Sequence, residues 1–111
     1  MTVKALTQVE QLVVRRAMRA TLDLFDWDFS TRIGIDTSAM SQLLALWPDI
    51  DDSDDNSDAC LAVNNALNEW LHGVGVSDRE SLAQLGVNRA EVVRIHEKWA
   101  ASRGWKSTGV R

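Results

Sequence analysis

The sequence predicts an all-α protein: a compact bundle or orthogonal array of four to five helices in a single domain. Three observations indicate this. The length of 111 residues suits one domain. Apolar residues recur at steps of three and four in several segments. Helix-capping signals separate those segments. The composition, 45% hydrophobic and 25% charged, is typical of a globular chain and excludes a disordered one. We expect the domain to span residues 1–105 and a flexible basic tail to span 106–111.

The first helix is expected from about Thr7 to Phe25. Thr7 and Glu10 form a capping box, in which each side chain bonds the other's free backbone amide. Arg15, Arg16 and Arg19 form the basic side of the helix. Its apolar positions predict a central, largely buried helix: Leu6, Val9, Val13, Ala17, Ala20 and Leu24, widened by Leu12, Val14, Met18 and Leu22.

The segment after this helix, residues 25–36, does not follow a helical period. Phe25, Trp27 and Phe29 alternate with polar residues, which is typical of a strand or of a loop that holds aromatic side chains to the core. A single strand would have no partner in this chain, so a loop is favoured.

Two helices are expected in the middle of the chain. One begins with Thr37 or Ser38 as its N-cap and ends at Pro48. The other begins at Ser57 or Asp58 and ends at Gly73 and Gly75. Its inward face is expected to consist of Cys60, Val63, Leu67, Trp70 and Leu71, with Asn64, Asn65, Asn68 and His72 turned away. The loop between the two helices, residues 49–58, is expected to be exposed because it is too charged to bury.

The C-terminal region predicts a helical hairpin. Ser77 and Glu80 form a second capping box, and Gly86 ends the helix that this box begins. Asn88 caps a last helix that reaches Gly104, with Val92, Ile95 and Trp99 on its inward face. Residues 77–104 resemble a helix-turn-helix, in which the second helix would present basic side chains to DNA. One departure is that Ala83 and Gly86 are separated by two residues, where such repressors usually have three.

Charge is unevenly distributed along the chain. The formal net charge is −4, but residues 26–76 carry nine aspartates and one glutamate against a single arginine, while both ends are basic. The single cysteine, Cys60, excludes an intramolecular disulfide and favours a cytoplasmic location. No apolar run approaches the roughly 18 residues of a membrane span, and no secretory signal is expected.

Catalytic and metal-binding motifs are incomplete. The acidic loop lacks the glycine and the final glutamate of an EF-hand in every register. Glu69 and His72 form one Glu-x-x-His pair where a di-iron bundle needs two. Cys60 lies on an apolar face, as an inert thiol would. We therefore expect no enzyme activity, no cofactor and no metal.

The sequence leads to two hypotheses of function. The first is a small regulatory module that binds a basic protein surface, or a second copy of itself, through the acidic loop: Asp49, Asp51, Asp52, Asp54, Asp55 and Asp58. Trp27 and Trp105 lie on irregular segments and are the candidate interface aromatics. The alternative is a DNA-binding regulator whose contacts are Arg89, Arg94, Lys98 and Arg103, with Arg15, Arg16 and Arg19 as a second contact.

Overall fold

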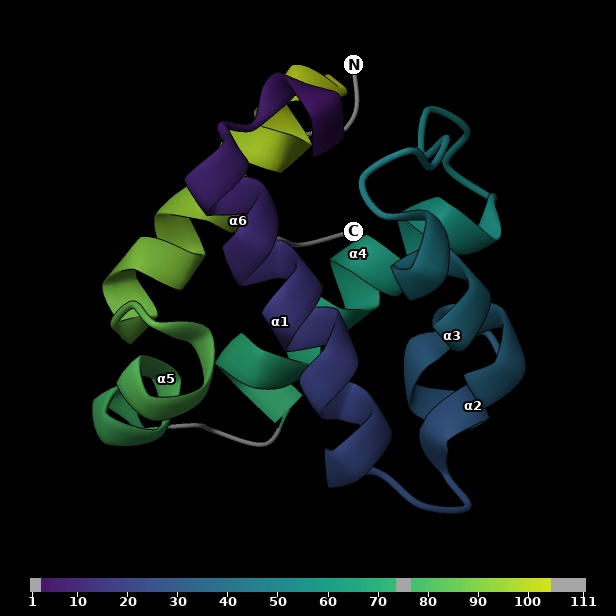
Figure 1. Ribbon diagram of the computed structural model, residues 1–111, viewed down its shortest axis with the longest axis horizontal. Coiled ribbons are helices and arrows are strands. Elements are labelled where there is room, and N and C mark those ends of the chain that lie inside the picture. The colour runs from purple at the N-terminus through teal and green to yellow at the C-terminus, as the bar shows by residue number, and fades with distance from the viewer. Residues whose placement is uncertain (1–2, 74–76, 105–111) are drawn as a thin grey trace.

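The computed structural model describes residues 3–73 and 77–104, and this part of the chain is all-α, as predicted (Figure 1). Trp105 and the expected tail, residues 106–111, lie outside the described residues. Within them no strand is present. The helices are α1 (Gln8–Leu24), α2 (Phe29–Ile33), α3 (Thr37–Leu46), α4 (Asp58–Asn68), α5 (Asp78–Leu85) and α6 (Arg89–Ser102), with a short 3₁₀ turn, η1 (Val3–Ala5), and a π-helical turn, η2 (Glu69–Gly73).

Helix α1 is central, as expected. It contacts α3, α4 and α5, and Figure 1 shows it between α5 and α6 on one side and α2 and α3 on the other. The Thr7–Glu10 capping box is confirmed. The predicted inward face is wrong at Val9, Leu12 and Leu24, which are 70%, 43% and 41% exposed, whereas Leu6 at its start is buried as predicted. Neighbouring helices pack against α1 on several sides, so the positions of those neighbours decide which residues are buried.

Helix α2 lies in the segment predicted as a loop, so that prediction is wrong for residues 29–33. Phe29 and Ile33 are one helical turn apart and both are buried. Gly34 ends the helix with φ +91°, a conformation that L-residues with side chains rarely adopt. Five residues are too few to show a helical period in the sequence. Trp27, just before this helix, is 90% exposed.

Helices α3 and α4 begin close to the predicted positions. Asp36, one residue before the predicted caps, accepts a hydrogen bond from the Ala39 amide at 2.8 Å, and Ser57 caps α4 as expected. The predicted inward face of α4 is confirmed, since all five of its residues are buried. At the end of α4 the helix widens into the π-helical turn η2, where the Trp70 indole N–H donates to the Ala17 carbonyl at 3.0 Å.

The C-terminal hairpin is confirmed as two capped helices. The Ser77 and Asn88 side chains cap α5 and α6, and Gly86 makes the turn with φ +84°. Val92, Ile95 and Trp99 are buried as predicted. Among the described residues, no helix has both the length and the apolar character that crossing a bilayer requires.

Candidate interaction surfaces and a histidine pocket

The acidic loop between α3 and α4 is anchored by one buried carboxylate. Asp52 is fully buried, so the prediction that the loop is exposed is wrong at this residue, as it is at Ile50, which is 6% exposed. Its oxygens accept hydrogen bonds from the Val3 amide at 3.2 and 3.3 Å and from the Trp99 indole N–H at 2.8 Å. These donors compensate the carboxylate for the water it loses on burial. Asp52 is therefore an internal anchor and not a surface contact.

Arg103 provides the positive charge at this anchor. Its side chain is only 2% exposed, and its guanidinium lies 3.9 Å from Asp52 and 2.9 Å from Asp55. It also donates to the Ser53 carbonyl at 3.3 Å. The guanidinium carbon lies 4.8 Å from the centre of the Trp99 ring, within the range of a cation–π interaction. The end of α6 thus holds the loop at several points.

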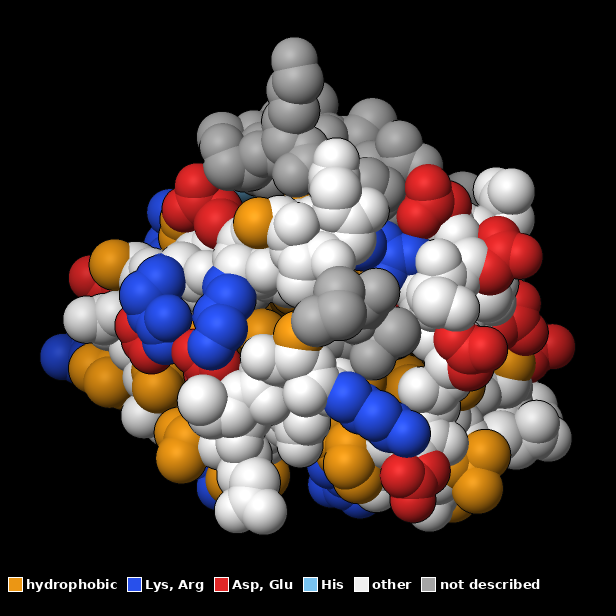
Figure 2. Space-filling view, turned by 90° about the horizontal axis from the view of Figure 1, so that it is seen from above, with side chains coloured by type: hydrophobic (Ala, Val, Ile, Leu, Met, Phe, Trp, Pro, Cys, Tyr) orange, Lys and Arg blue, Asp and Glu red, His pale blue; other side chains and the backbone are white. Residues whose placement is uncertain are grey.

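The other aspartates of residues 49–58 are exposed, and the last of them, Asp58, is the first residue of α4. Asp49 pairs with Lys4 at 3.7 Å, whereas Asp51, Asp54 and Asp58 form no ion pair within the described part of the chain. Hydrogen bonds from the Ser53 side chain and amide lower the pKa of Asp51, so this carboxylate is ionised at neutral pH. Figure 2 shows acidic side chains gathered on the side of the molecule where Figure 1 places the α3–α4 loop.

The cations predicted to contact DNA are engaged within the fold. Arg94 lies 2.8 Å from Glu10 and 2.6 Å from Glu91, and Lys98 lies 2.7 Å from Glu10. Arg89 donates to the Leu71 carbonyl. These contacts join α6 to α1 and to η2, and they compete with any contact to phosphate.

Glu10 is the buried member of this charge cluster. Burial raises its pKa, but hydrogen bonds from Lys98, the Thr7 amide and Arg94 outweigh that effect and lower the pKa to about 2. The sequence identified Glu10 only as half of a capping box. Its pairing with α6 spans more than eighty residues, which local spacing does not reveal.

The basic side of α1 remains at the surface. Arg15, Arg16 and Arg19 are all exposed. Arg16 donates to the Leu85 carbonyl at 3.4 Å, and Arg19 lies 3.5 Å from Asp23. Arg15 and Arg19 border an open groove of about 380 Å³ between α1 and α3.

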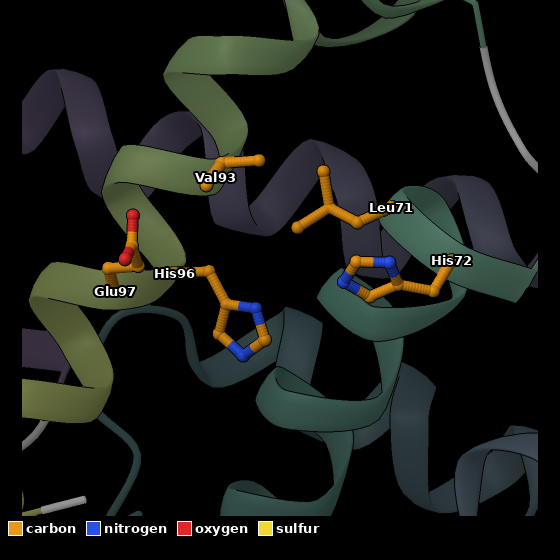
Figure 3. A pocket seen from close by; sticks show the side chains of 5 residues that line it. All are labelled: Leu71, His72, Val93, His96 and Glu97. Atoms are coloured by element: carbon orange, nitrogen blue, oxygen red, sulfur yellow. The ribbon is translucent and has the colours of Figure 1, made fainter. Parts of the chain in front are cut away.

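Both histidines of the chain line one pocket, which the sequence did not predict. The pocket is about 120 Å³ and is lined by Leu71, His72, Val93, His96 and Glu97. Figure 3 shows the two imidazole rings on opposite sides of it, His72 from η2 and His96 from α6. His72 is exposed and His96 is only 1% exposed. Burial, and then the proximity of His72, lower the pKa of His96 to about 4, so its ring is neutral at physiological pH.

An asparagine on α4 orients the buried histidine. The prediction that Asn64 faces away from the core is wrong, because Asn64 is only 7% exposed and its Oδ1 lies 3.0 Å from His96 Nε2. Asn64 can be buried because its side-chain oxygen has a hydrogen-bond partner in the His96 ring. Glu69, which the sequence paired with His72, instead binds Arg32 at 3.1 Å and does not line the pocket.

Cys60 is buried, as predicted for an inert thiol. Among residues 3–73 and 77–104, no cluster of three or more histidine, cysteine, aspartate or glutamate side chains has an arrangement suited to a metal ion.

No protein-family model matches the sequence, and comparison with curated proteins and with solved structures found no significant similarity.

Proposed function

We propose that this protein is an interaction module that binds a basic protein surface through the exposed carboxylates of the 49–58 loop, chiefly Asp51, Asp54 and Asp58. The observation that carries the proposal is the buried Asp52 anchor. Because Asp52 and Arg103 fix the loop to α6, the exposed carboxylates are held in place before a partner arrives. A preorganised loop loses less conformational entropy on binding, and its negative charge speeds association with a basic surface.

Charge pairing favours this proposal over the DNA-binding alternative. Three of the four hairpin cations predicted to contact DNA are already paired with carboxylates: Arg94, Lys98 and Arg103. By contrast, Asp51, Asp54 and Asp58 form no ion pair among the described residues. Binding to DNA releases counterions in proportion to the phosphates that are neutralised. Cations that already have carboxylate partners must break these ion pairs before they can neutralise phosphates.

The test compares two triple variants with equal changes in net charge. The loop variant carries Asp51→Asn, Asp54→Asn and Asp58→Asn. The control carries Asp23→Asn, Asp26→Asn and Glu80→Gln, three exposed carboxylates outside the loop. Each protein is immobilised, exposed to a nuclease-treated lysate and washed at two salt concentrations, and the retained proteins are identified by mass spectrometry.

The proposal expects a basic protein that the wild type and the control retain and the loop variant loses, with an apparent affinity at least about tenfold lower. The melting temperatures of all three proteins should be close, because the substituted side chains are exposed. Equal retention by the two triple variants would contradict the proposal.

The alternative function retains one observation in its favour, the exposed row of Arg15, Arg16 and Arg19. If DNA is the ligand, we expect a fluorescent duplex to bind with an affinity that falls steeply as salt rises. Replacing the three arginines with alanine should abolish that binding. Absence of duplex binding at low salt would exclude this alternative.

A further inference from the structure

A chain of side-chain amides fixes which nitrogen of His96 carries its proton. The Ile33 carbonyl can only accept, so Asn65 donates to it through Nδ2 at 2.7 Å and its Oδ1 accepts from Asn64 Nδ2 at 3.3 Å. Asn64 Oδ1 is then the atom that faces His96 Nε2 at 3.0 Å. A carbonyl oxygen has no proton to give, so Nε2 must be the protonated nitrogen.

The other ring nitrogen of His96 is therefore an acceptor without a proton. Because the ring is neutral, Nδ1 keeps a free lone pair, and the described residues provide no hydrogen-bond donor to it. Figure 3 shows this nitrogen on the side of the ring that faces His72 and Leu71, across the pocket. This nitrogen is not one of the buried atoms that lack a hydrogen-bond partner, so it is accessible from the pocket. A ligand that supplies an N–H or O–H group can donate to it there.

The size and lining of the pocket restrict what can bind. Its volume of about 120 Å³ is a little less than the roughly 150 Å³ of a cavity that accommodates benzene, so it holds a single ring. Leu71 and Val93 provide aliphatic contacts, and the imidazoles of His72 and His96 border the pocket from opposite sides. The π-helical turn that carries His72 is a rare local structure that often occurs at functional sites.

The geometry points to a binding site for a small, uncharged, planar molecule that carries one hydrogen-bond donor, such as a phenol. The ring lies between Leu71, Val93 and the face of His72, and its O–H donates to His96 Nδ1. The amide chain from Ile33 to Asn64 positions His96 for this contact. The site involves none of the exposed carboxylates of the 49–58 loop, so it is independent of the proposed protein interaction.

Phenol and toluene provide a direct test on the wild-type protein, because the two molecules have nearly the same shape and differ in the donor. Each is titrated into isotope-labelled protein, and the methyl resonances of Leu71 and Val93 and the ring resonances of His96 are followed by NMR. We expect saturable shifts that are largest at these residues, and about tenfold tighter binding of phenol, which is the contribution of one hydrogen bond.

Two variants locate the binding. Val93→Phe fills the pocket and should abolish the phenol shifts at Leu71 and His96. Val9→Phe adds the same ring at a position that is 70% exposed and should leave binding unchanged. Three results would overturn the inference: no saturable shift at millimolar phenol, equal affinity for toluene, or phenol binding that persists in a folded Val93→Phe protein. The comparison of phenol with toluene needs no variant and remains decisive if Val93→Phe does not fold.

Discussion

Replacing Asp52 with asparagine removes the charge at the centre of the buried anchor. The substitution leaves one acceptor oxygen and places an amide N–H₂ group where an oxygen now lies 2.8 Å from the Trp99 indole N–H. Hydrogen bonds to a charged group contribute about 1.5–3 kcal/mol each. Stripping a buried charge of its partner costs about 3–5 kcal/mol, but Arg103 keeps Asp55 at 2.9 Å. We therefore expect Asp52→Asn to lower the free energy of unfolding by about 3 kcal/mol.

Thermal and urea unfolding followed by circular dichroism measure this loss. For a domain of this size 1 kcal/mol corresponds to about 4 °C in melting temperature, so Asp52→Asn should melt about 12 °C below the wild type. The matched control is Asp54→Asn two residues away. Its oxygen can still accept from the Asn56 amide, so its melting temperature should not change. A loss below about 1 kcal/mol for Asp52→Asn would refute the view that Asp52 anchors the loop.

Three further changes test separate parts of the fold. The pKa of Glu10 is about 2 in the folded protein against 4.5 ordinarily, so its stabilisation is complete above pH 4.5 and is lost as the pH falls towards 2. Glu10→Gln should be about 2 kcal/mol less stable at pH 7 and lack that acid loss in urea titrations. The pKa of His96 is about 4 in the folded protein and ordinarily 6.5, so between these pH values the unfolded chain binds a proton that the folded chain does not. Wild-type stability should fall from pH 6.5 to 4, and His96→Gln should lack this slope. Gly86→Ala should cost about 1–2 kcal/mol because φ is +84° and the new Cβ would lie 2.8 Å from Arg16 Nη1. Gly104→Ala has nearly the same φ of +82° but open space around the new Cβ, so it should cost only the backbone strain and therefore less in the same unfolding assay.

Local signals predicted most of the helices. Thr7, Ser57, Ser77 and Asn88 all cap the helices that the sequence assigned to them. A cap acts through a bond to an amide two or three residues away, so the residues that specify it are adjacent in the sequence. The short helix α2 was not predicted because its five residues contain only one pair of apolar residues a turn apart, Phe29 and Ile33.

The buried polar contacts could not be predicted in the same way. Asp52 meets Trp99 across forty-seven residues, Glu10 meets Lys98 across eighty-eight, and Asn64 meets His96 across thirty-two. Each of these polar residues is taken as exposed when it is considered alone, because burial without a partner is costly. The partner is specified by the packing of α6 against α1 and α4, which follows from the core as a whole.

The pairing of α6 decides which charges of this protein face a partner. Arg94, Lys98 and Arg103 neutralise carboxylates of α1, α6 and the loop, so the basic helix contributes little free positive charge to the surface. The same contacts leave Asp51, Asp54 and Asp58 as the exposed carboxylates of a loop that Arg103 holds in place. The negative charge of the loop and the fixed position of the loop can therefore be tested by separate substitutions. Asp52→Asn keeps all three exposed carboxylates but releases the loop from its anchor. At a temperature where this variant is folded, it should still bind the partner more weakly than the wild type, because part of the binding free energy is spent on ordering the loop.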